Sequence, residues 1–594
     1  MDDVSSLPRV SKEQKVRYVA RRYTAGTLCN ESWQVDAGGD SRYLMGISIG
    51  VDPDMMTAGD TQQLGLAYID ISTDRAVATR LVKLDELEHE LTRVSPVEIV
   101  MERRMEGSML ATEVGGDGIG KAVKSLQALL KGSDIALSYV DPGQVDNIPS
   151  SSLSRLETSA MHLVTTHLSA CLMDAMPQLL PPHHQEPKTT MQIDASTLLG
   201  LEVRHSLRNG AQSMTGRSFP PTVGSSPVSR SGTLLSVIRR TLTTSGTRLL
   251  VHTLTQPSAH LPTITRRHSL VHAFLERSAL RQDLRDFLRT QSARGRIGAG
   301  TGSLGEIVRI VQKFSAARQR SSASAGGGRS AAKHYGGPMA ALGNARDLMD
   351  LREKIQGIRW IVERIKQEVD TEIAKGIDGT DRTERLRSLV AEHVDLASLV
   401  QLIDGAVQRG ALDRAEEMTE EDEETALAAS GKTSGVWWLR PDFNDTLQGL
   451  FVQVQSLETQ RSSMESDLQT RFNTPLLELK TSPFAPGLFV YVPTKKGNTG
   501  LVEQDDQLIP LRANKTAKTY LFGPWTVLGL KIQEIHDKIA RAQEEAFDEL
   551  REQILTRQNE LLVNAGLLDE IDLTLGFAQA ADELRWVRPE MEEE

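Results

Sequence analysis

Five cationic side chains in the last fifth of the sequence are the strongest candidates for binding chemistry. They follow or lie within two short segments that we expect to contain strands, 487–494 and 509–522. Lysine and arginine in such loops can pair with phosphate groups, and this contact depends on salt and carries no sequence information. The alternative is an exposed hairpin whose cations contact only water. The five residues are Lys495, Lys496, Arg512, Lys515 and Lys518.

Asp70 is a carboxylate whose position suggests hydrolytic chemistry. It lies in the strand-like segment LGLAYIDIST, and a strand carboxylate can hold Mg²⁺ for phosphodiester cleavage. Such a nuclease needs two or three further converging carboxylates, and we can place none. Two glycine clusters are imperfect phosphate loops, because 115–121 has neither known spacing and the GKT at 431–433 has Ala426 in place of the first glycine. We therefore predict no catalytic site.

Residues that bind metals or form disulfides are sparse. Cys29 and Cys171 are too few for a disulfide framework or a zinc ribbon, which favours a reducing compartment. His183 and His184 lie in a proline-flanked segment without cysteine or acidic partners at ligand spacing, so we expect them to be solvated. We predict no metal site and no cofactor bound by this chain.

The charge of the chain is distributed unevenly. Its net charge of −11 argues against general nucleic-acid binding, yet residues 201–320 hold 19 lysines and arginines against 5 acidic residues. Such asymmetry is expected of a protein with one region that faces a polyanion and with acidic outer surfaces. The alternative is a basic, partly disordered insertion, because residues 210–231 are rich in Ser, Gly, Pro and Thr.

Periodicity predicts the elements that position these residues. Residues 43–180 alternate strands and helices, which indicates a small α/β domain with a mixed sheet. Residues 232–289 read as three short helices with arginines between their apolar stripes. No run of ~18 apolar residues predicts a membrane span, and the N-terminus reads as neither a secretory signal nor a transit peptide. Longer helices are expected at 344–375, 381–408 and 440–480, and helical segments separated by a short joint at 523–591.

Several short motifs follow one another in an informative order. An entry segment, MQIDASTLLGLE (191–202), is followed by TTSGTRLL (243–250), QPS and ITRRHSLVHAF (264–274). A closing helix near the C-terminus contains Ile571 and Asp572. In residue types and in order, these segments resemble the core domain of the MutS family of DNA mismatch repair proteins. The matching residues include Met191, Asp194, Thr197, Glu202, Thr243, Gly246, Arg248, Phe577, Ala578 and Ala581.

Further segments extend the resemblance in both directions. RRYTAGTL (21–28) is similar to the linker between the mismatch-reading and connector domains of the family, with Ala25 where the family usually has Pro. The following ESW and SRYLMGIS look most like the fungal mitochondrial MutS homologue. The strands with basic loops, set between long helices, resemble the clamp of the family, which holds DNA by its backbone. Arg588-Pro589 resembles the lead into the ATPase domain.

The resemblance implies a mainly α protein with a small α/β (RNase H-like) connector domain, a helical core, long lever helices and a small β clamp tip. It covers roughly residues 16–590. The implied divisions are 1–40, a linker from a missing mismatch-reading domain; 41–182, the connector; 187–345, the helical core with disordered insertions; 346–480, lever and clamp helices; 481–522, the β clamp tip; and 523–594, the returning lever helix and core end.

By the same resemblance we expect a DNA mismatch repair protein whose partners are duplex DNA and a second copy or another MutS-type protein. Mismatch reading and ATP hydrolysis, with ATP and Mg²⁺, are expected only in the full-length relative, so this chain alone is predicted not to be an enzyme. The alternative is a helical scaffold that does not bind DNA and interacts with a MutS partner. The predicted location is mitochondrial if the closest resemblance holds and nuclear otherwise.

Overall fold

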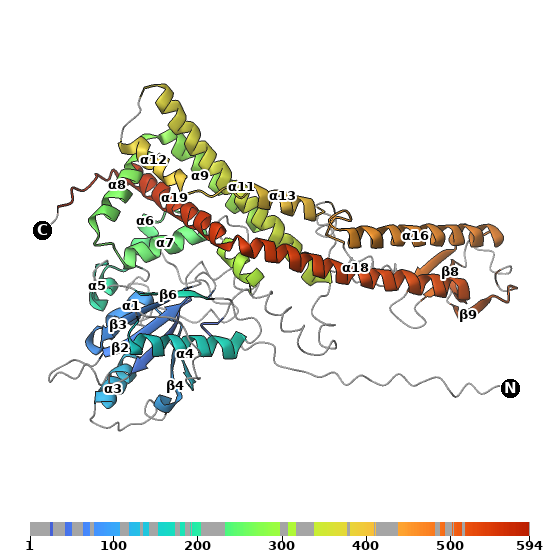
Figure 1. The fold of residues 1–594 in the computed structure, drawn as a ribbon, viewed down its shortest axis with the longest axis horizontal. Coiled ribbons are helices and arrows are strands. Elements are labelled where there is room, and N and C mark those ends of the chain that lie inside the picture. The colour runs from blue at the N-terminus through green and yellow to red at the C-terminus, as the bar shows by residue number, and fades with distance from the viewer. Residues whose placement is uncertain are drawn as a thin grey trace.

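In the computed structural model, an α/β domain lies beside a helical hub, and a long arm of two helices extends from the hub (Figure 1). Within the described part of the chain, no helix is long and apolar enough to cross a membrane. The described residues are 24–27, 42–49, 63–71, 76–106, 118–130, 135–141, 153–172, 179–184, 190–191, 193–203, 232–297, 307–315, 338–376, 381–408, 410, 437–481, 488–493, 502, 504–513 and 517–592.

The α/β domain is built on a six-stranded mixed sheet. Its strands are β1 (Leu44–Ile49), β2 (Gln63–Ile69), β3 (Ala76–Lys83), β4 (Glu98–Glu102), β5 (Ala136–Val140) and β6 (Leu180–His184), and its helices are α1 (Leu87–Val94), α3 (Gly118–Leu130) and α4 (Arg155–Leu172). The strand order is β5-β4-β1-β2-β3-β6, with β1 antiparallel to β2 and parallel to β4. α1 and α3 pack on one face of the sheet and α4 on the other.

Two glycines allow α4 to lie directly on the sheet. A Cβ atom at Gly46 would come within 2.5 Å of the carbonyl oxygen of Ala160, and one at Gly65 within 2.1 Å of that of Leu156. Only glycine permits so close an approach between a strand and a helix backbone. The small mixed sheet is confirmed, whereas α4 and β6 were not predicted. β6 reads LPPHH, which has no alternation of apolar and polar residues.

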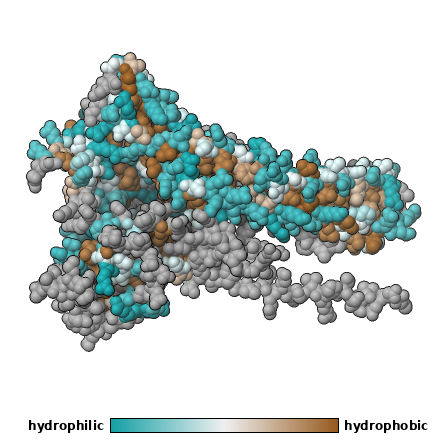
Figure 2. All heavy atoms as spheres, in the orientation of Figure 1, coloured by the Kyte–Doolittle hydropathy of each residue, from teal (hydrophilic) through white to brown (hydrophobic). Residues whose placement is uncertain are grey.

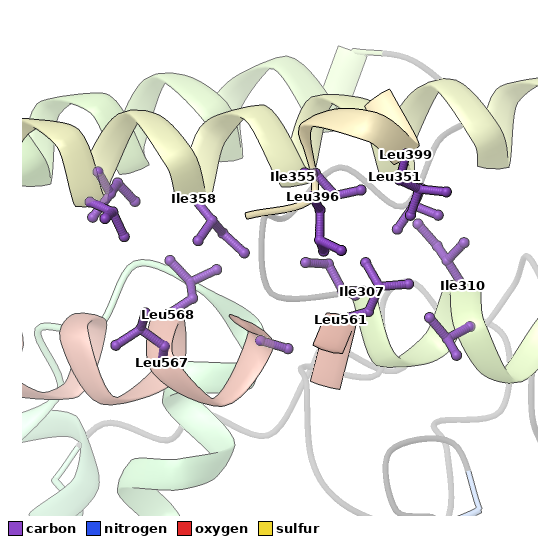
Figure 3. Close-up of a cluster of buried hydrophobic side chains, with 14 of the residues drawn as sticks. Ile307, Ile310, Leu351, Ile355, Ile358, Leu396, Leu399, Leu561, Leu567 and Leu568 are labelled. Carbon is purple, nitrogen blue, oxygen red and sulfur yellow. The ribbon is translucent and has the colours of Figure 1, made fainter. Parts of the chain in front are cut away.

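The helical hub gathers segments from the middle and the end of the chain. Its helices are α5 (Ala195–Gly200), α6 (Leu234–Ile238), α7 (Thr244–Thr255), α8 (Leu261–Glu276), α9 (Ser278–Ile297), α11 (Pro338–Ala374), α12 (Asp381–Ala391), α13 (Ala397–Ala406) and α19 (Gln558–Leu584). The three short helices predicted at 232–289 are found as α6, α7 and α8, and a fourth helix, α9, begins at Ser278 within the same range. Figure 3 shows side chains of α11, including Ile355 and Ile358, meeting Leu561 and Leu568 of α19 in one apolar core.

The helix predicted at 381–408 is wrong as one continuous element, because the chain leaves helical geometry between α12 and α13. At this break the side chain of Asn564 on α19 bonds to the backbone of Val394. The Val394 N–H donates to Asn564 Oδ1 at 3.0 Å, and Asn564 Nδ2 donates to the Val394 carbonyl at 2.8 Å. A side chain from a distant helix therefore satisfies the backbone groups that the interrupted helix leaves unpaired.

The arm consists of α16 (Asp445–Arg471) and the first part of α18 (Gly523–Thr556), which run side by side (Figure 1). Asn444 begins α16 by accepting the Leu447 N–H at 2.8 Å. Leu447, Val454 and Leu468 are buried, and their spacing in multiples of seven is typical of a two-stranded coiled coil. The helix predicted at 440–480 ends earlier, at Arg471, and Asn473 follows with a left-handed φ of 47°.

The tip sheet caps the far end of the arm. Its strands are β7 (Glu478–Thr481), β8 (Leu488–Pro493), β9 (Leu508–Ala513) and β10 (Ala517–Phe522), in the antiparallel order β7-β8-β10-β9. One face packs on the arm, where Val490 and Tyr520 meet Trp525. A Cβ atom at Gly529 would lie 2.6 Å from the Leu488 side chain, so this glycine sets how closely α18 approaches β8.

Candidate nucleic-acid interface

Two of the five predicted phosphate-binding residues lie in the described part of the tip sheet. Arg512 is exposed near the end of the edge strand β9, and Lys518 is half-buried at the start of β10. Lys495, Lys496 and Lys515 lie outside the described residues. In the sequence, Lys495 and Lys496 follow β8, and Lys515 lies between β9 and β10.

The two described cations belong to opposite faces of the hairpin. Arg512 pairs with Thr519 across the ladder, and Lys518 pairs with Ala513. Successive residues of a strand point to opposite faces, so Arg512 shares a face with Thr519, and Lys518 is on the other face. Lys518 shares its face with Tyr520, which packs on the arm, so the candidate interface is the rim of the sheet and not one whole face.

Local ion pairs reduce the negative charge of the tip sheet. Residues 478–522 contain six lysines and arginines and four acidic residues. Asp505 lies 2.7 Å from the guanidinium of Arg471 on α16, and Glu478 lies 2.8 Å from Lys480. The tip sheet is thus a slightly cationic region in a chain whose net charge is −11.

The basic segment 201–320 was expected to face a polyanion, and the structure corrects this interpretation for several of its arginines. They pair with carboxylates from distant parts of the hub, so their charge is used within the fold. The pairs are Arg240 with Glu583 at 2.6 Å, Arg266 with Glu570 at 2.8 Å, Arg277 with Glu372 at 2.6 Å and Arg281 with Asp582 at 2.5 Å.

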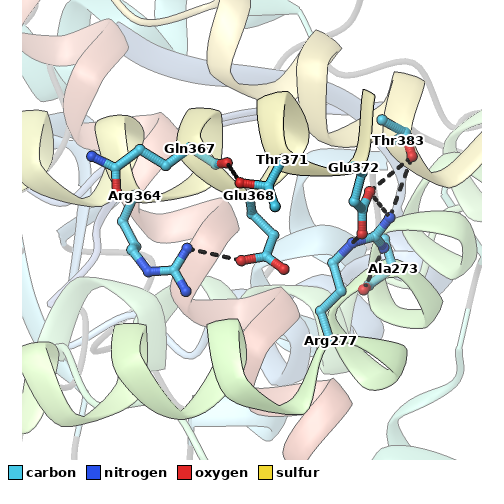
Figure 4. Close-up of polar contacts among 8 residues, drawn as sticks. All are labelled: Ala273, Arg277, Arg364, Gln367, Glu368, Thr371, Glu372 and Thr383. Atoms are coloured by element: carbon cyan, nitrogen blue, oxygen red, sulfur yellow. Dashed lines mark hydrogen bonds and ion pairs between the residues drawn. The ribbon is translucent and has the colours of Figure 1, made fainter. Parts of the chain in front are cut away.

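Arg277 shows how such a pair joins three helices (Figure 4). Its Nε and Nη2 donate to the two carboxylate oxygens of Glu372 on α11, at 2.6 and 2.7 Å. Thr383 of α12 donates to the same carboxylate at 3.0 Å, and Arg277 also donates to the carbonyl of Ala273 at 2.8 Å. Hydrogen bonds from Arg277 lower the pKa of Glu372, and the nearby charge adds to this effect.

Two of the motif segments noted in the sequence meet inside the hub. Asp572 of α19 is fully buried and accepts the N–H of Leu242 at 3.0 Å and the N–H and hydroxyl of Thr243 at 2.8 and 2.7 Å. Thr243 in turn caps α7 by accepting the Gly246 N–H at 2.9 Å. A Cβ atom at Gly246 would lie 2.3 Å from Asp572 Oδ2, so glycine is required. Burial raises the pKa of Asp572, and the hydrogen bonds from Thr243 and Leu242 oppose this shift.

The turn 24–27, part of the RRYTAGTL motif, is held by a buried polar network that sequence reasoning missed. Glu98 Oε2 accepts the Gly26 N–H at 2.7 Å, and its Oε1 lies 3.1 Å from His167 Nε2. Burial opposes protonation of His167, but Cys171 and Glu98 outweigh it and raise the pKa of His167 to about 9. Burial acts against the charged form of Glu98, but hydrogen bonds led by that of His167 lower its pKa. A charged pair therefore anchors this turn to α4 and β4.

The structure does not support hydrolytic or metal chemistry at the residues considered for it. Asp70 is buried, and its Oδ2 accepts the Arg42 N–H at 2.8 Å. Among the described residues, no group of three or more His, Cys, Asp or Glu side chains could hold a metal ion. His184, expected to be solvated, is exposed on β6, and its Nδ1 also lies 2.8 Å from the Glu157 carboxylate. The GKT at 431–433 lies outside the described residues.

Comparison with known proteins finds one family model and several relatives that this chain matches. The family described as MutS domain III matches residues 196–578. Over 609 residues, the chain is 24% identical to the DNA mismatch repair protein MutS of Nitrobacter hamburgensis, covering 100% of this chain and 55% of that protein. It is 25% identical over 614 residues to the protein of the same name from Nitrobacter winogradskyi, covering 100% of this chain and 56% of the relative. The identity to the Roseobacter denitrificans protein is 31% over 283 residues, covering 47% of this chain and 28% of the relative.

Proposed function

The chain belongs to the MutS family of DNA mismatch repair proteins, and we propose that it binds duplex DNA through contacts between the rim of the tip sheet and the phosphate backbone. It spans about half the length of the first two relatives described above. The observation that carries the proposal is the hairpin β9–β10, which places Arg512 and Lys518 at the far end of the arm. Contacts of this kind hold a duplex without reading its sequence.

The length of the arm supports this function. α18 has 34 residues, about 51 Å at 1.5 Å per residue. Its first part belongs to the arm, and its later part, from Ala542 on, packs in the apolar core of the hub. The tip sheet therefore lies well away from the hub, as Figure 1 shows, and can reach a duplex that the hub does not contact. We interpret α16 and α18 as the lever and the tip sheet as the clamp of the family.

We also propose that the α/β domain is an RNase H-like connector. Its strand order supports this, because the antiparallel hairpins β1–β2 and β2–β3 continue through β1 into the parallel strands β4 and β5. We propose in addition that Asp70 has a structural role in this domain and no catalytic one.

The activities of the whole protein are proposed for full-length relatives. They comprise mismatch reading and ATP hydrolysis with Mg²⁺, and assembly with a second copy or another MutS-type protein. We propose that this chain alone does not hydrolyse ATP, since its printed sequence contains no complete phosphate loop. A mitochondrial location, or a nuclear one if the fungal resemblance fails, stays a proposal as well.

The test of DNA binding is its dependence on salt. We expect a short duplex to bind at low salt and the logarithm of the binding constant to fall linearly with the logarithm of salt concentration, by about 0.9 per phosphate contact. Changing Lys495, Lys496, Arg512, Lys515 and Lys518 to Ala should remove about 4.5 units of this slope. Changing only the two residues that the structure describes, Arg512→Ala with Lys518→Ala, should lower this slope by about 2.

A matched control removes two exposed cations elsewhere. Arg359 is exposed on α11 and Lys375 is exposed directly after it, and changing both to Ala should leave the slope unchanged. If wild type does not bind duplex at low salt, or if the variant with five substitutions binds as well as wild type, the duplex proposal is wrong. The alternative, a helical scaffold that acts on a MutS partner, would then be preferred.

A further inference from the structure

The face of the tip sheet that points away from the arm carries aromatic and apolar side chains. Val490 of β8 is buried against the arm, so strand alternation places Phe489 and Tyr491 on the other face, and both are half-buried. Leu521 of β10 pairs with Ile509 of β9 on this same outer face. Ile509 is 57% exposed, which is unusual for an isoleucine in a folded sheet.

Cations border this apolar centre on both edge strands. On β9, Arg512 pairs with Thr519, which places it on the outer face. On β7, Lys480 pairs with Phe489, and its Nζ lies 4.2 Å from the centroid of the Tyr491 ring. Lys480 also lies 2.8 Å from Glu478, which pairs with Tyr491 on the same face. The outer face is therefore aromatic in the middle, with Arg512 at one side and the Lys480–Glu478 ion pair at the other.

The arm leaves the outer face open while it closes the β7 edge. Side chains of α16 bond to the backbone of that edge, where Arg461 donates to the Leu479 carbonyl at 2.8 Å and Glu465 accepts the Leu479 N–H at 3.0 Å. α16 and α18 pack on the other face of the sheet through the apolar cluster around Trp525. Figure 2 shows apolar residues gathered at the far end of the arm.

This combination suits unpaired bases better than it suits a paired duplex. Every base has an apolar face that stacks on an aromatic ring, and its phosphate can pair with a cation at the border of the platform. In a duplex, those faces are already stacked on neighbouring base pairs. Phe489 and Tyr491 are two residues apart, about 6.8 Å along the strand, and the four strands span about 14 Å, which leaves room for two or three bases.

We propose that the outer face of the tip sheet binds unpaired DNA bases, with stacking on Phe489 and Tyr491 and phosphate contacts from Lys480 and Arg512. This inference rests on the proposed role of the tip sheet in DNA binding and names a second class of DNA for it. Lys480 lies over the Tyr491 ring and beside Glu478, and its flexible side chain turns from both toward a phosphate when a base stacks on the ring.

The test compares three DNA probes by fluorescence anisotropy at one salt concentration. They are a blunt duplex, the same duplex with a single-stranded thymidine overhang, and that duplex with an abasic overhang of equal length. Wild type should bind the thymidine overhang at least tenfold more tightly than the blunt duplex, since stacking contributes about 1–3 kcal/mol per base. The abasic overhang keeps the phosphates and lacks the bases, so it should lose most of this preference.

Ring-removing substitutions test the assignment to the outer face. Phe489→Leu with Tyr491→Leu keeps apolar side chains and removes both rings, and should lower affinity for the thymidine overhang about tenfold without changing blunt-duplex binding. Tyr491→Phe keeps the ring and should behave as wild type. The abasic probe needs no variant, so the inference stays testable even if the double variant fails to fold.

Each outcome separates this inference from the duplex proposal. Equal binding of abasic and thymidine overhangs, or no preference over the blunt duplex, overturns the inference and leaves the duplex proposal intact. Base-dependent binding of the overhang without blunt-duplex binding supports the inference and rejects the duplex proposal. If wild type binds none of the probes, both are wrong. A change in self-association of the double variant in sedimentation velocity, with DNA binding unchanged, would show that the face is occupied by a second copy and overturn the inference.

Discussion

In the hub, Arg240, Arg277 and Arg281 each reach a carboxylate from a distant part of the chain, whereas in the tip sheet Arg512 lies exposed on an edge strand. The same residue type therefore serves two purposes, joining helices in one region and facing solvent in the other. In the sequence, the hub segment had the larger positive charge and looked like the better site for a polyanion. Charge density along a chain shows where cations are, and only their partners show whether a ligand can use them.

The two regions also differ in how their helices are packed. α19 is buried on several sides, with Leu561, Leu568, Ile571 and Leu575 all inaccessible. On α16, the buried positions Leu447, Val454 and Leu468 form a single narrow stripe against α18. Because few apolar contacts hold the arm, we expect it to open locally at a lower free energy than the hub. The following predictions test this difference, in order of decreasing effect.

Loss of the buried carboxylate in the hub should have the largest effect. Asp572→Ala leaves the N–H groups of Leu242 and Thr243 without their acceptor and removes a negative charge from the N-terminus of α7. We expect the free energy of unfolding to fall by about 3 kcal/mol, as measured by urea denaturation followed by circular dichroism. Glu583→Ala, on the same helix but at an exposed ion pair, should cost less than about 1 kcal/mol. Similar values for the two variants would contradict the role of Asp572 as the anchor of α7.

Crowding the contact between the arm and the tip sheet should act locally. Gly529→Val places a side chain against Leu488 and should destabilise the tip sheet by about 2 kcal/mol. Hydrogen exchange should then accelerate in β8 and β10 and stay unchanged in α19. At Gly449 of α16 a Cβ atom meets nothing within 4 Å, so Gly449→Val is the control for a branched residue in an arm helix. Faster exchange in both the tip sheet and α19 would mean that arm and hub unfold as one unit.

The Arg277 contact should show a smaller effect that depends on pH. Arg277→Lys keeps the charge but loses the paired hydrogen bonds to Glu372, which should cost about 1 kcal/mol at pH 7. The pKa of Glu372 is lowered in the folded state, so this stabilisation is present above its unfolded pKa, near 4.5, and is lost as pH falls through the lowered folded pKa. Urea denaturation at pH 7 and at pH 3 measures both values. A difference between wild type and variant that does not shrink at the lower pH would show that Glu372 is not the relevant partner.

Much of the element order could be predicted because it rests on local periodicity. The alternating strands of the α/β domain and the stripes of α7 and α8 are repeats of two and of three to four residues, which neighbours in the chain determine. The resemblance of several short motifs in the same order also named the family that the comparisons support. Elements without a periodic signal, such as β6, or with a tertiary cause, such as the break at Val394, were missed.

The candidate site was predictable in part. The sequence identified the hairpin and its cations, since basic residues next to short strands can be recognised locally. It did not show that Arg512 and Lys518 point to opposite faces, because the face depends on the register between β9 and β10. Nor did it show that Phe489 and Tyr491 lie on the outer face, because this follows only from the packing of the arm on the other face.

The sequence by itself determined the family, the types of most elements and the location of the hairpin that carries Arg512 and Lys518, because each depends on residues close together in the chain. The tertiary structure decided which charges are available. Glu583 and Asp572 lie more than 300 residues from Arg240 and Thr243, and only the packing of α19 against α7 and α8 brings them within hydrogen-bonding distance. A pairing across such a separation has no local signal, since it is selected by the burial of both helices in one core.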